Sequence, residues 1–296
     1  MKKPLFNKVC IIGVGLIGGS LGLAIKRKKL AKEVVGIPHR MNPTGQEALR
    51  IKAIDSVAAT FKDGAKDADL VILAMPILTN VIWMKTHSQL LNEKAIVIDV
   101  GSTKKNIQDA AEKHLSQAVF VGCHPMAGSE KKGIENAKWN LFVNANCFIT
   151  TPHKKIEQLW RSVGARPIVL TPEEHDKWVA LVSHLPHLLA FILLKMVGGT
   201  VNNAFLNSIG YLNPSFRSLA RIAKSNPRLW ADILVSNRKE VSQAILELVK
   251  NLQEIQAILT LPSTSDKADF SQEAHDKLQK IILIANHNAS KLLPND

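Results

Sequence analysis

Apolar runs of strand length recur along the first half of the chain, between segments with helix-like spacing. The runs are rich in β-branched residues, as a parallel sheet covered on both faces requires. Their alternation with helices predicts right-handed β-α-β crossovers. We therefore expect a doubly wound α/β sheet built from residues 8–13, 33–37, 69–76, 95–101 and 119–125. Two later runs, 146–152 and 166–171, flank a predicted helix at 154–164 and are expected to extend this sheet.

A glycine-rich turn follows the first predicted strand and opens the first predicted helix. Gly13, Gly15 and Gly18 form the GxGxxG pattern, with Leu16 and Ile17 in the first helical turn. The first glycine permits a tight turn, the second lets a pyrophosphate approach the backbone, and the third lets the helix pack on the sheet. Free amides at the helix start would then bind phosphate. A Rossmann-type dinucleotide site is predicted, the alternative being a glycine-rich turn without a ligand.

The pattern changes at Thr171. The segment TPEEHDKW combines a cap residue, a proline that a helix start tolerates, and acidic residues in the first turn. Beyond it we expect helices, the long ones near 173–197, 227–260 and 271–293, with 261–266 as the clearest connector. The predicted organisation is a dinucleotide-binding domain at 1–171 and an all-α substrate and dimerisation domain at 172–296.

Long amphipathic helices in that second domain predict a homodimer. The last long helices would otherwise expose an apolar stripe to solvent. The alternative is that the stripe closes a helix bundle within one chain. The stripe consists of Leu246, Val249, Leu252, Ile255 and Leu259.

The cofactor preference is encoded after the second predicted strand. An NAD site carries an acidic residue there for the ribose hydroxyls, whereas this chain continues Gly36-Ile37-Pro38-His39-Arg40 without a carboxylate. Arg40, together with His39, could receive a 2′-phosphate through charge-assisted hydrogen bonds. NADP is therefore favoured over NAD. The alternative is that Arg40 stacks on adenine or faces solvent.

Composition and charge indicate which classes of partner and which cellular compartment to expect. The net charge of +13 attracts anions in general, but the bases are scattered outside Lys26–Lys29 and only 5% of residues are aromatic. We therefore expect small anionic ligands and no nucleic acid. The apolar stretch 9–25 is too glycine-rich and too short for a membrane helix, so no membrane association is expected. Three widely spaced cysteines form no CxxC pair, which favours a reducing, cytoplasmic setting.

Candidate catalytic residues follow the later strands. Ser102 lies just beyond the strand at 95–101 and His124 ends the next one. Open α/β sheets bind ligands at these carboxyl ends. The segment SHLPH adds His184 and His187 on the first long helix of the second domain. No metal site is expected, because neither histidine has an acidic residue at HExxH spacing.

These segments together resemble the prephenate and arogenate dehydrogenase family of tyrosine biosynthesis. The similarity runs from about residue 8 to residue 260, and HPMAGSEKKG with SHLPH is its most specific part. The resemblance implies an NAD(P)-dependent oxidative decarboxylation of a cyclohexadienol that carries two carboxylates. The matching segments are GVGLIGGS, DVGSTK, HPMAGSEKKGIENA, LFVNANCFITTP, SHLPHLLA and RIAKSNPRLW.

The resemblance also implies roles for individual residues. His124 would accept the proton of the substrate hydroxyl, and Ser102 would orient that hydroxyl, His124 or the nicotinamide; from spacing alone Ser102 could equally cap the following helix. Arg221 would bind a substrate carboxylate, and His187 would face the substrate side chain and favour prephenate. His184 is expected to be structural. Ser129 and Glu130 would border the pocket, with Glu130 in a charged gate or, alternatively, in a solvated loop pair with Lys131.

The chain also departs from the family pattern. Many relatives have glycines and an aspartate before the arginine, whereas this chain has Asn213-Pro214-Ser215-Phe216-Arg217-Ser218, which alters the gate. Two other classes stay open. A β-hydroxyacid or imine-reductase type of dehydrogenase would need a catalytic lysine, for which Lys195 or Lys224 would serve. A redox-sensing protein would hold NADP without turnover.

Overall fold

The computed structural model describes residues 3–38, 43–128, 131–200, 213–262 and 271–292. The chain divides into two compact units, Met1–Val241 and Ser242–Asp296. Every described site residue named below lies in the first unit. The domain boundary at 171/172 stays a prediction.

A six-stranded parallel sheet forms the centre of the first unit, in the order β3-β2-β1-β4-β5-β6. It confirms the doubly wound fold predicted from the apolar runs, although the two-residue strand β3 had no signal in the sequence. The strands are β1 (Phe6–Ile12), β2 (Ala31–Ile37), β3 (Ser56–Val57), β4 (Leu70–Leu73), β5 (Ile96–Asp99) and β6 (Val119–Val121).

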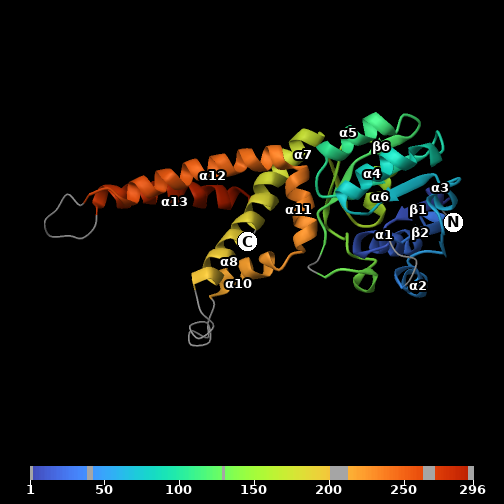
Figure 1. Ribbon diagram of the computed structural model, residues 1–296, viewed down its shortest axis with the longest axis horizontal. Coiled ribbons are helices and arrows are strands. Elements are labelled where there is room, and N and C mark those ends of the chain that lie inside the picture. Colours follow the sequence, from blue (N-terminus) through green and yellow to red (C-terminus); the bar gives the residue numbers. More distant parts are fainter. Residues whose placement is uncertain (1–2, 39–42, 129–130, 201–212, 263–270, 293–296) are drawn as a thin grey trace. The chain divides into compact units, whose positions relative to one another are not determined.

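Helices cover both faces of this sheet (Figure 1). Alternate residues of β1 explain how: Val9 and Ile11 belong to one apolar core with α1 and α6, and Cys10 and Ile12 belong to the other with α4 and α5. Burial on both faces is the reason that these strands are continuously apolar. The helices are α1 (Leu16–Arg27), α2 (Thr44–Arg50), α3 (Phe61–Ala65), α4 (Ile77–His87), α5 (Lys105–His114) and α6 (Lys154–Ser162), with 3₁₀ turns η1 (Ser88–Leu90) and η2 (Ile134–Asn136).

The predicted extension of this sheet is wrong. A separate three-stranded sheet forms instead from β7 (Cys123–Pro125), β8 (Asn146–Ile149) and β9 (Arg166–Val169), with β7 antiparallel to β8. The run predicted as one strand at 119–125 breaks at Gly122. The Gly122 N–H donates to Thr150 Oγ1 at 2.9 Å and its carbonyl accepts from Thr150 N at 2.9 Å. These bonds turn the chain out of the first sheet toward β8.

Helices follow Thr171, as predicted. Thr171 Oγ1 accepts from Glu174 N at 3.2 Å while Thr171 N donates to Glu174 Oε2 at 2.9 Å, a capping box. A π-helical segment, Ala180–His184, lies between two of the helices, and such segments are frequent at functional sites. The helices are α7 (Pro172–Val179), α8 (Leu185–Thr200), α10 (Pro214–Ala223), α11 (Pro227–Ser236), α12 (Arg238–Leu259) and α13 (Gln272–Leu292).

The single helix predicted at 227–260 divides at Asn237. This residue is buried, and its side-chain amide donates to the Asp176 carbonyl at 2.8 Å. Its backbone leaves helical geometry at φ −108° and ψ 26°, which ends α11 before α12 begins. The predicted connector 261–266 falls partly outside the described residues.

The run Pro172–Gly198 is long and apolar enough to cross a membrane by length and composition alone. Core helices and signal sequences pass the same test, so this is weak evidence for a membrane span.

Candidate active site

The glycine loop has the geometry that a dinucleotide-binding turn needs. Gly13 follows β1 with φ +98°, and its N–H donates to the Ile37 carbonyl at the end of β2 at 2.8 Å. A Cβ at Gly13 would lie 2.7 Å from the Ala74 carbonyl oxygen, and a Cβ at Gly18 would lie 2.1 Å from the Gly13 carbonyl oxygen. Both positions therefore require glycine.

The start of α1 is open. Gly15 is the N-cap and offers no side chain, so the first-turn amides, including those of Leu16 and Ile17, have no side-chain cap. Among the residues that the structure describes, none has an atom within 4 Å of the place that a Cβ at Gly15 would take. The first turn also carries no acidic residue. Free amides, the helix dipole and open space together fit a bound pyrophosphate.

Gly15→Ala and Gly13→Ala are expected to impair different properties, nucleotide affinity in the first and thermal stability in the second. In Gly15→Ala the alanine methyl group would occupy the space next to the helix start. It should weaken nucleotide binding about 5- to 150-fold, the equivalent of an overpacking cost of about 1–3 kcal/mol, without lowering Tm. Gly13→Ala should lower Tm, because its Cβ meets Ala74 and its φ is positive. Calorimetric titration and thermal melting measure the two effects. Unchanged affinity in Gly15→Ala would contradict the phosphate site.

His39 and Arg40 lie outside the described residues. The described part of β2 ends beside Gly13, through the bond between Gly13 N and Ile37 O. The end of β2 at Ile37 therefore lies next to the glycine loop. The preference for NADP stays a prediction.

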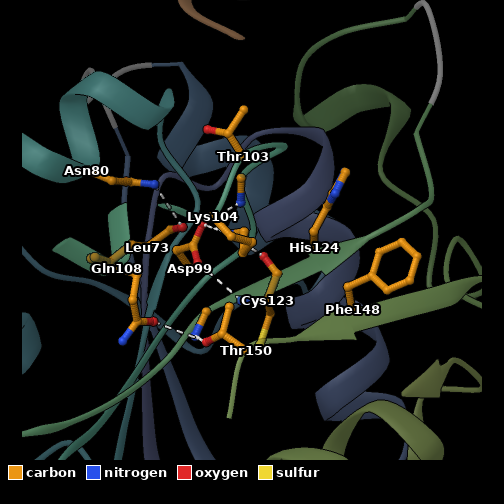
Figure 2. A network of polar contacts seen from close by, with 12 residues as sticks. Leu73, Asn80, Asp99, Thr103, Lys104, Gln108, Cys123, His124, Phe148 and Thr150 are labelled. Carbon is orange, nitrogen blue, oxygen red and sulfur yellow. Dashed lines mark hydrogen bonds and ion pairs between the residues drawn. The ribbon is translucent and has the colours of Figure 1, made fainter. Parts of the chain in front are cut away.

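A buried ion pair stands at the carboxyl ends of the strands, and the sequence did not reveal it. Lys104 and Asp99 are completely buried and paired, and Lys104 Nζ also donates to the Cys123 carbonyl at 2.8 Å. Asp99 Oδ1 accepts from Cys123 N at 3.2 Å. Figure 2 shows this pair between β5 and the strand that carries His124. It ties β7 to the first sheet, because both of its members bond the backbone of Cys123.

Ser102 lies in the loop between β5 and α5 and is partly exposed. The alternative that it caps α5 is wrong, because the N-cap is Lys104, which has no cap from its own side chain. The carboxylate of Asp176 takes that role from α7: Oδ1 accepts from Lys104 N at 2.7 Å and Oδ2 from Lys105 N at 2.9 Å. The role of Ser102 toward substrate stays a prediction.

His124 is the middle residue of β7 and its side chain is partly exposed. Its ring projects from the strand on the side where Lys104 and Thr103 lie (Figure 2). Burial, followed by the charges of His175 and Lys104, holds the pKa of His124 well below its usual value. The imidazole is therefore neutral at pH 7, the form that a general base needs.

Two further residues join His124 in a row, and neither was singled out from the sequence. His124 Nδ1 lies 2.8 Å from His175 Nε2, and His175 Nδ1 lies 2.7 Å from Asp176 Oδ1. Both partners come from α7, whose sequence signal was its cap at Thr171. The motif TPEEHDKW contained the pair, but no spacing pattern connects it to a strand 51 residues earlier.

The histidines of the SHLPH segment have different surroundings. His184 is buried, and its Nδ1 lies 3.2 Å from Asn237 Nδ2. His187 Nδ1 donates to the Ser183 carbonyl at 2.8 Å, and its ring stacks on Trp230 at 3.7 Å between centroids. Because Nδ1 holds the proton, the neutral His187 ring presents an acceptor at Nε2. Burial lowers the pKa of His187, and the charge of Arg221 lowers it further, which disfavours the doubly protonated ring.

Arg221 and Arg217 are exposed on α10. The segment that departs from the family pattern starts this helix: the Asn213 side chain accepts from Phe216 N at 2.8 Å, and Pro214 stands in the first turn. The dipeptide Asn213-Pro214 is a typical sequence signal for the start of a helix. Ser129 and Glu130 lie outside the described residues. Lys195 and Lys224 are both exposed.

Comparison with known proteins identifies the family. The model of the prephenate dehydrogenase nucleotide-binding domain matches residues 21–169, and that of the prephenate dehydrogenase dimerization domain matches residues 171–283. The chain belongs to the prephenate dehydrogenase family of oxidoreductases. Prephenate dehydrogenase from Bacillus subtilis is 33% identical over 91% of this chain and 75% of that protein.

Two other proteins match this chain over nearly the whole of their own length. Cyclohexadienyl dehydrogenase from Zymomonas mobilis is 29% identical over 93% of this chain and 95% of that protein. The solved structure of prephenate dehydrogenase from A. aeolicus, in complex with hydroxyphenyl propionate and NAD+, has a TM-score of 0.83 and 28% identity, and covers 97% of this chain and 98% of that one. The resemblance drawn from the motifs is thus confirmed.

Proposed function

We propose that this member of the prephenate dehydrogenase family catalyses the NADP-dependent oxidative decarboxylation of prephenate to 4-hydroxyphenylpyruvate, a step of tyrosine biosynthesis. The observation that carries the proposal is the neutral, partly exposed His124 in the middle of β7, with its Nδ1 bonded to His175. Such a ring leaves Nε2 for a substrate hydroxyl. Family membership supports the reaction class.

Side chains of this protein accept and return the substrate proton and bind the substrate carboxylates. A bound nicotinamide supplies the hydride acceptor. As the hydride leaves the ring carbon, His124 Nε2 takes the proton of the hydroxyl on that carbon, which becomes a carbonyl. The ring carboxylate then leaves as carbon dioxide, its bonding electrons make the ring aromatic, and the resulting phenolate recovers the proton from His124. No net proton is consumed.

Substrate binding falls to residues of the helical part. Arg221 would bind a carboxylate through its planar fork, and His187 would contact the side chain of the substrate. Arg221 is on α10 and His187 on α8, and the charge of Arg221 lowers the pKa of His187. Ser102, in the β5–α5 loop, would orient the substrate hydroxyl; Ser129 and Glu130 would border the pocket.

The deciding experiment follows the absorbance of the reduced nicotinamide with prephenate, arogenate and a panel of hydroxyacids. Turnover should require a cyclohexadienol and release carbon dioxide in equal amount. Turnover of hydroxyacids instead would favour the lysine-dependent dehydrogenases, with Lys195 or Lys224 to test. Tight NADP binding without any turnover would favour a sensing protein and remove the proposal.

One observation favours arogenate as a second substrate. We expected His187 to donate to the oxygens of the prephenate side chain, but donation from Nε2 requires the doubly protonated ring, because Nδ1 already donates to Ser183. The neutral ring would instead accept from the ammonium group of arogenate. Arg217 and Arg221 favour the dianionic prephenate. The ratio of kcat/KM for the two substrates decides between them.

NADP is the expected cofactor. In the sequence Arg40 follows β2 where an NAD site would carry an acidic residue, and β2 ends at Ile37 beside the glycine loop. The wild type should show a higher kcat/KM with NADP than with NAD, and Arg40→Ala should lower the NADP value about 10- to 100-fold while changing the NAD value little. Steady-state kinetics with both cofactors measure this. A clear preference of the wild type for NAD would exclude the prediction.

A homodimer is expected in solution. Leu246, Val249, Leu252 and Leu259 of α12 are exposed in the single chain, with Leu259 at 64%, and the matching family model is a dimerization domain. Exposed stripes of this kind cover one another in oligomers. Light scattering at micromolar concentration should give twice the chain mass of 32.5 kDa. A 32.5 kDa particle would contradict the dimer. The cytoplasm stays the expected compartment.

A further inference from the structure

His124, His175 and Asp176 form a row of side chains that are hydrogen-bonded in that order. His124 Nδ1 meets His175 Nε2 at 2.8 Å, and His175 Nδ1 meets Asp176 Oδ1 at 2.7 Å. His175 is completely buried and Asp176 is 2% exposed. The proposed reaction uses only the first member of this row, so the function of the two buried members needs an explanation.

The position of each proton follows from the chemistry of the groups. Both oxygens of Asp176 accept bonds from backbone N–H groups, as suits a carboxylate, so the proton between Asp176 and His175 belongs to His175 Nδ1. A neutral imidazole has one N–H, which makes His175 Nε2 an acceptor. The proton of the next bond then belongs to His124 Nδ1. His124 Nε2 is left with a free lone pair.

His175 must be neutral for this order to hold, and its surroundings keep it so. Burial lowers the pKa of His175, although the bond to Asp176 opposes this. The other charged groups that act on His175 are Lys104 and Asp99, which are paired with each other. The groups whose charges act on His124 are His175, Lys104 and His184, and burial lowers the pKa of His184 to about 4. Each of these histidines is therefore uncharged at pH 7.

Asp176 is held in place from three sides. Its two oxygens accept from Lys104 N and Lys105 N at the start of α5, and its carbonyl accepts from Asn237 Nδ2 at 2.8 Å. The same carboxylate thus ends the loop that carries Ser102 and supports the ring behind His124. These bonds fix the orientation of the Asp176 carboxylate. Because His175 is hydrogen-bonded to that carboxylate, the orientation of the His175 ring is fixed as well.

From this row we infer that His175 and Asp176 are positioning residues that hold His124 with its proton on Nδ1, so that Nε2 faces the substrate as the base. The inference deepens the proposed function and rests on it for the identity of the substrate. When His124 takes a proton, its Nδ1–H keeps an acceptor in His175, and the negative charge of Asp176 lies behind it. The alternative is that His175 only fills space against Phe148, whose ring centroid is 5.4 Å away.

The first test reads the protonation state of His124 without turnover. In ¹⁵N-histidine-labelled protein at pH 7.5, the His124 ring should show the chemical shifts of a neutral imidazole with the proton on Nδ1; His124→Asn assigns its signal. In His175→Phe the signal should move toward the Nε2–H form or a mixture. A wild-type His124 with its proton on Nε2 would overturn the inference, whether or not the variant folds.

The second test separates positioning from packing. His175→Phe keeps a ring of similar size but no acceptor, whereas His175→Gln keeps an acceptor near the place of Nε2. The expected kcat is about 10- to 100-fold below wild type for His175→Phe and within a few-fold for His175→Gln, with KM within about two-fold in both. Equal loss in both variants, or loss only through KM, would mean that His175 merely packs.

Failure of the inference and failure of the proposed function are distinguishable. If the protein turns over prephenate and kcat is unaltered in His175→Phe, the proposed function stands and the positioning role of His175 is refuted. A protein without turnover can still show the predicted tautomer of His124 in the labelled sample, which would uphold the geometry and refute the reaction.

Discussion

His124→Asn should lower kcat about 10²- to 10⁴-fold, the ordinary contribution of a general base. Asparagine keeps a polar side chain of similar reach but cannot accept the hydroxyl proton as the hydride leaves. The free energy of activation should therefore rise by about 2.7–5.5 kcal/mol. Steady-state turnover with prephenate measures the loss. Nucleotide affinity should be unchanged, since the predicted phosphate site at the start of α1 involves different residues.

The matched control for this variant is His114→Asn. His114 is in the last turn of α5 and takes no part in the row behind His124. It should retain the activity of the wild type. If His124→Asn turns over prephenate as fast as this control does, His124 has a structural role and the proposed base is wrong.

Arg221→Ala should raise KM for prephenate about 10- to 100-fold and change kcat by much less. A guanidinium bound to a carboxylate contributes in the ground state and in the transition state alike, so its loss weakens binding without slowing the bound substrate. The measurement is the dependence of initial rate on prephenate concentration at saturating cofactor.

Arg228→Ala provides the comparison on a neighbouring helix. Arg228 is exposed in the first turn of α11, and the arginine whose charge acts on His187 is Arg221. This variant should have the KM of the wild type. Equal KM values in Arg221→Ala and Arg228→Ala would show that Arg221 does not bind the substrate carboxylate.

Most strands and helices of the fold were predictable because their signals are local. Continuous apolar runs predicted β1, β2, β4 and β5, and the capping box predicted the helix start after Thr171. The errors occurred where a distant contact redirects the chain. Gly122 pairs with Thr150 and sends β7 into a second sheet, and the bond from Asn237 to Asp176 divides a helix that its periodicity predicts as continuous.

The glycine loop and the family were determined by the sequence alone. Gly13, Gly15 and Gly18 follow the fixed spacing GxGxxG, and the segments around His124 and His187 are specific for the family. A linear sequence pattern was therefore sufficient to predict both. Their steric reasons are also short-range, as the approach of Gly18 to the Gly13 carbonyl shows.

Only the tertiary structure decided which residues support His124. A lysine and an aspartate are normally exposed, so nothing in the sequence indicated that Lys104 and Asp99 form a buried pair beneath β7. The row from His124 to Asp176 likewise joins residues about 50 positions apart, which no periodicity records. Burial and direction of a hydrogen bond depend on what packs around each group. The chain order therefore supplies His124, and the packing around it determines which groups its ring nitrogens can bond.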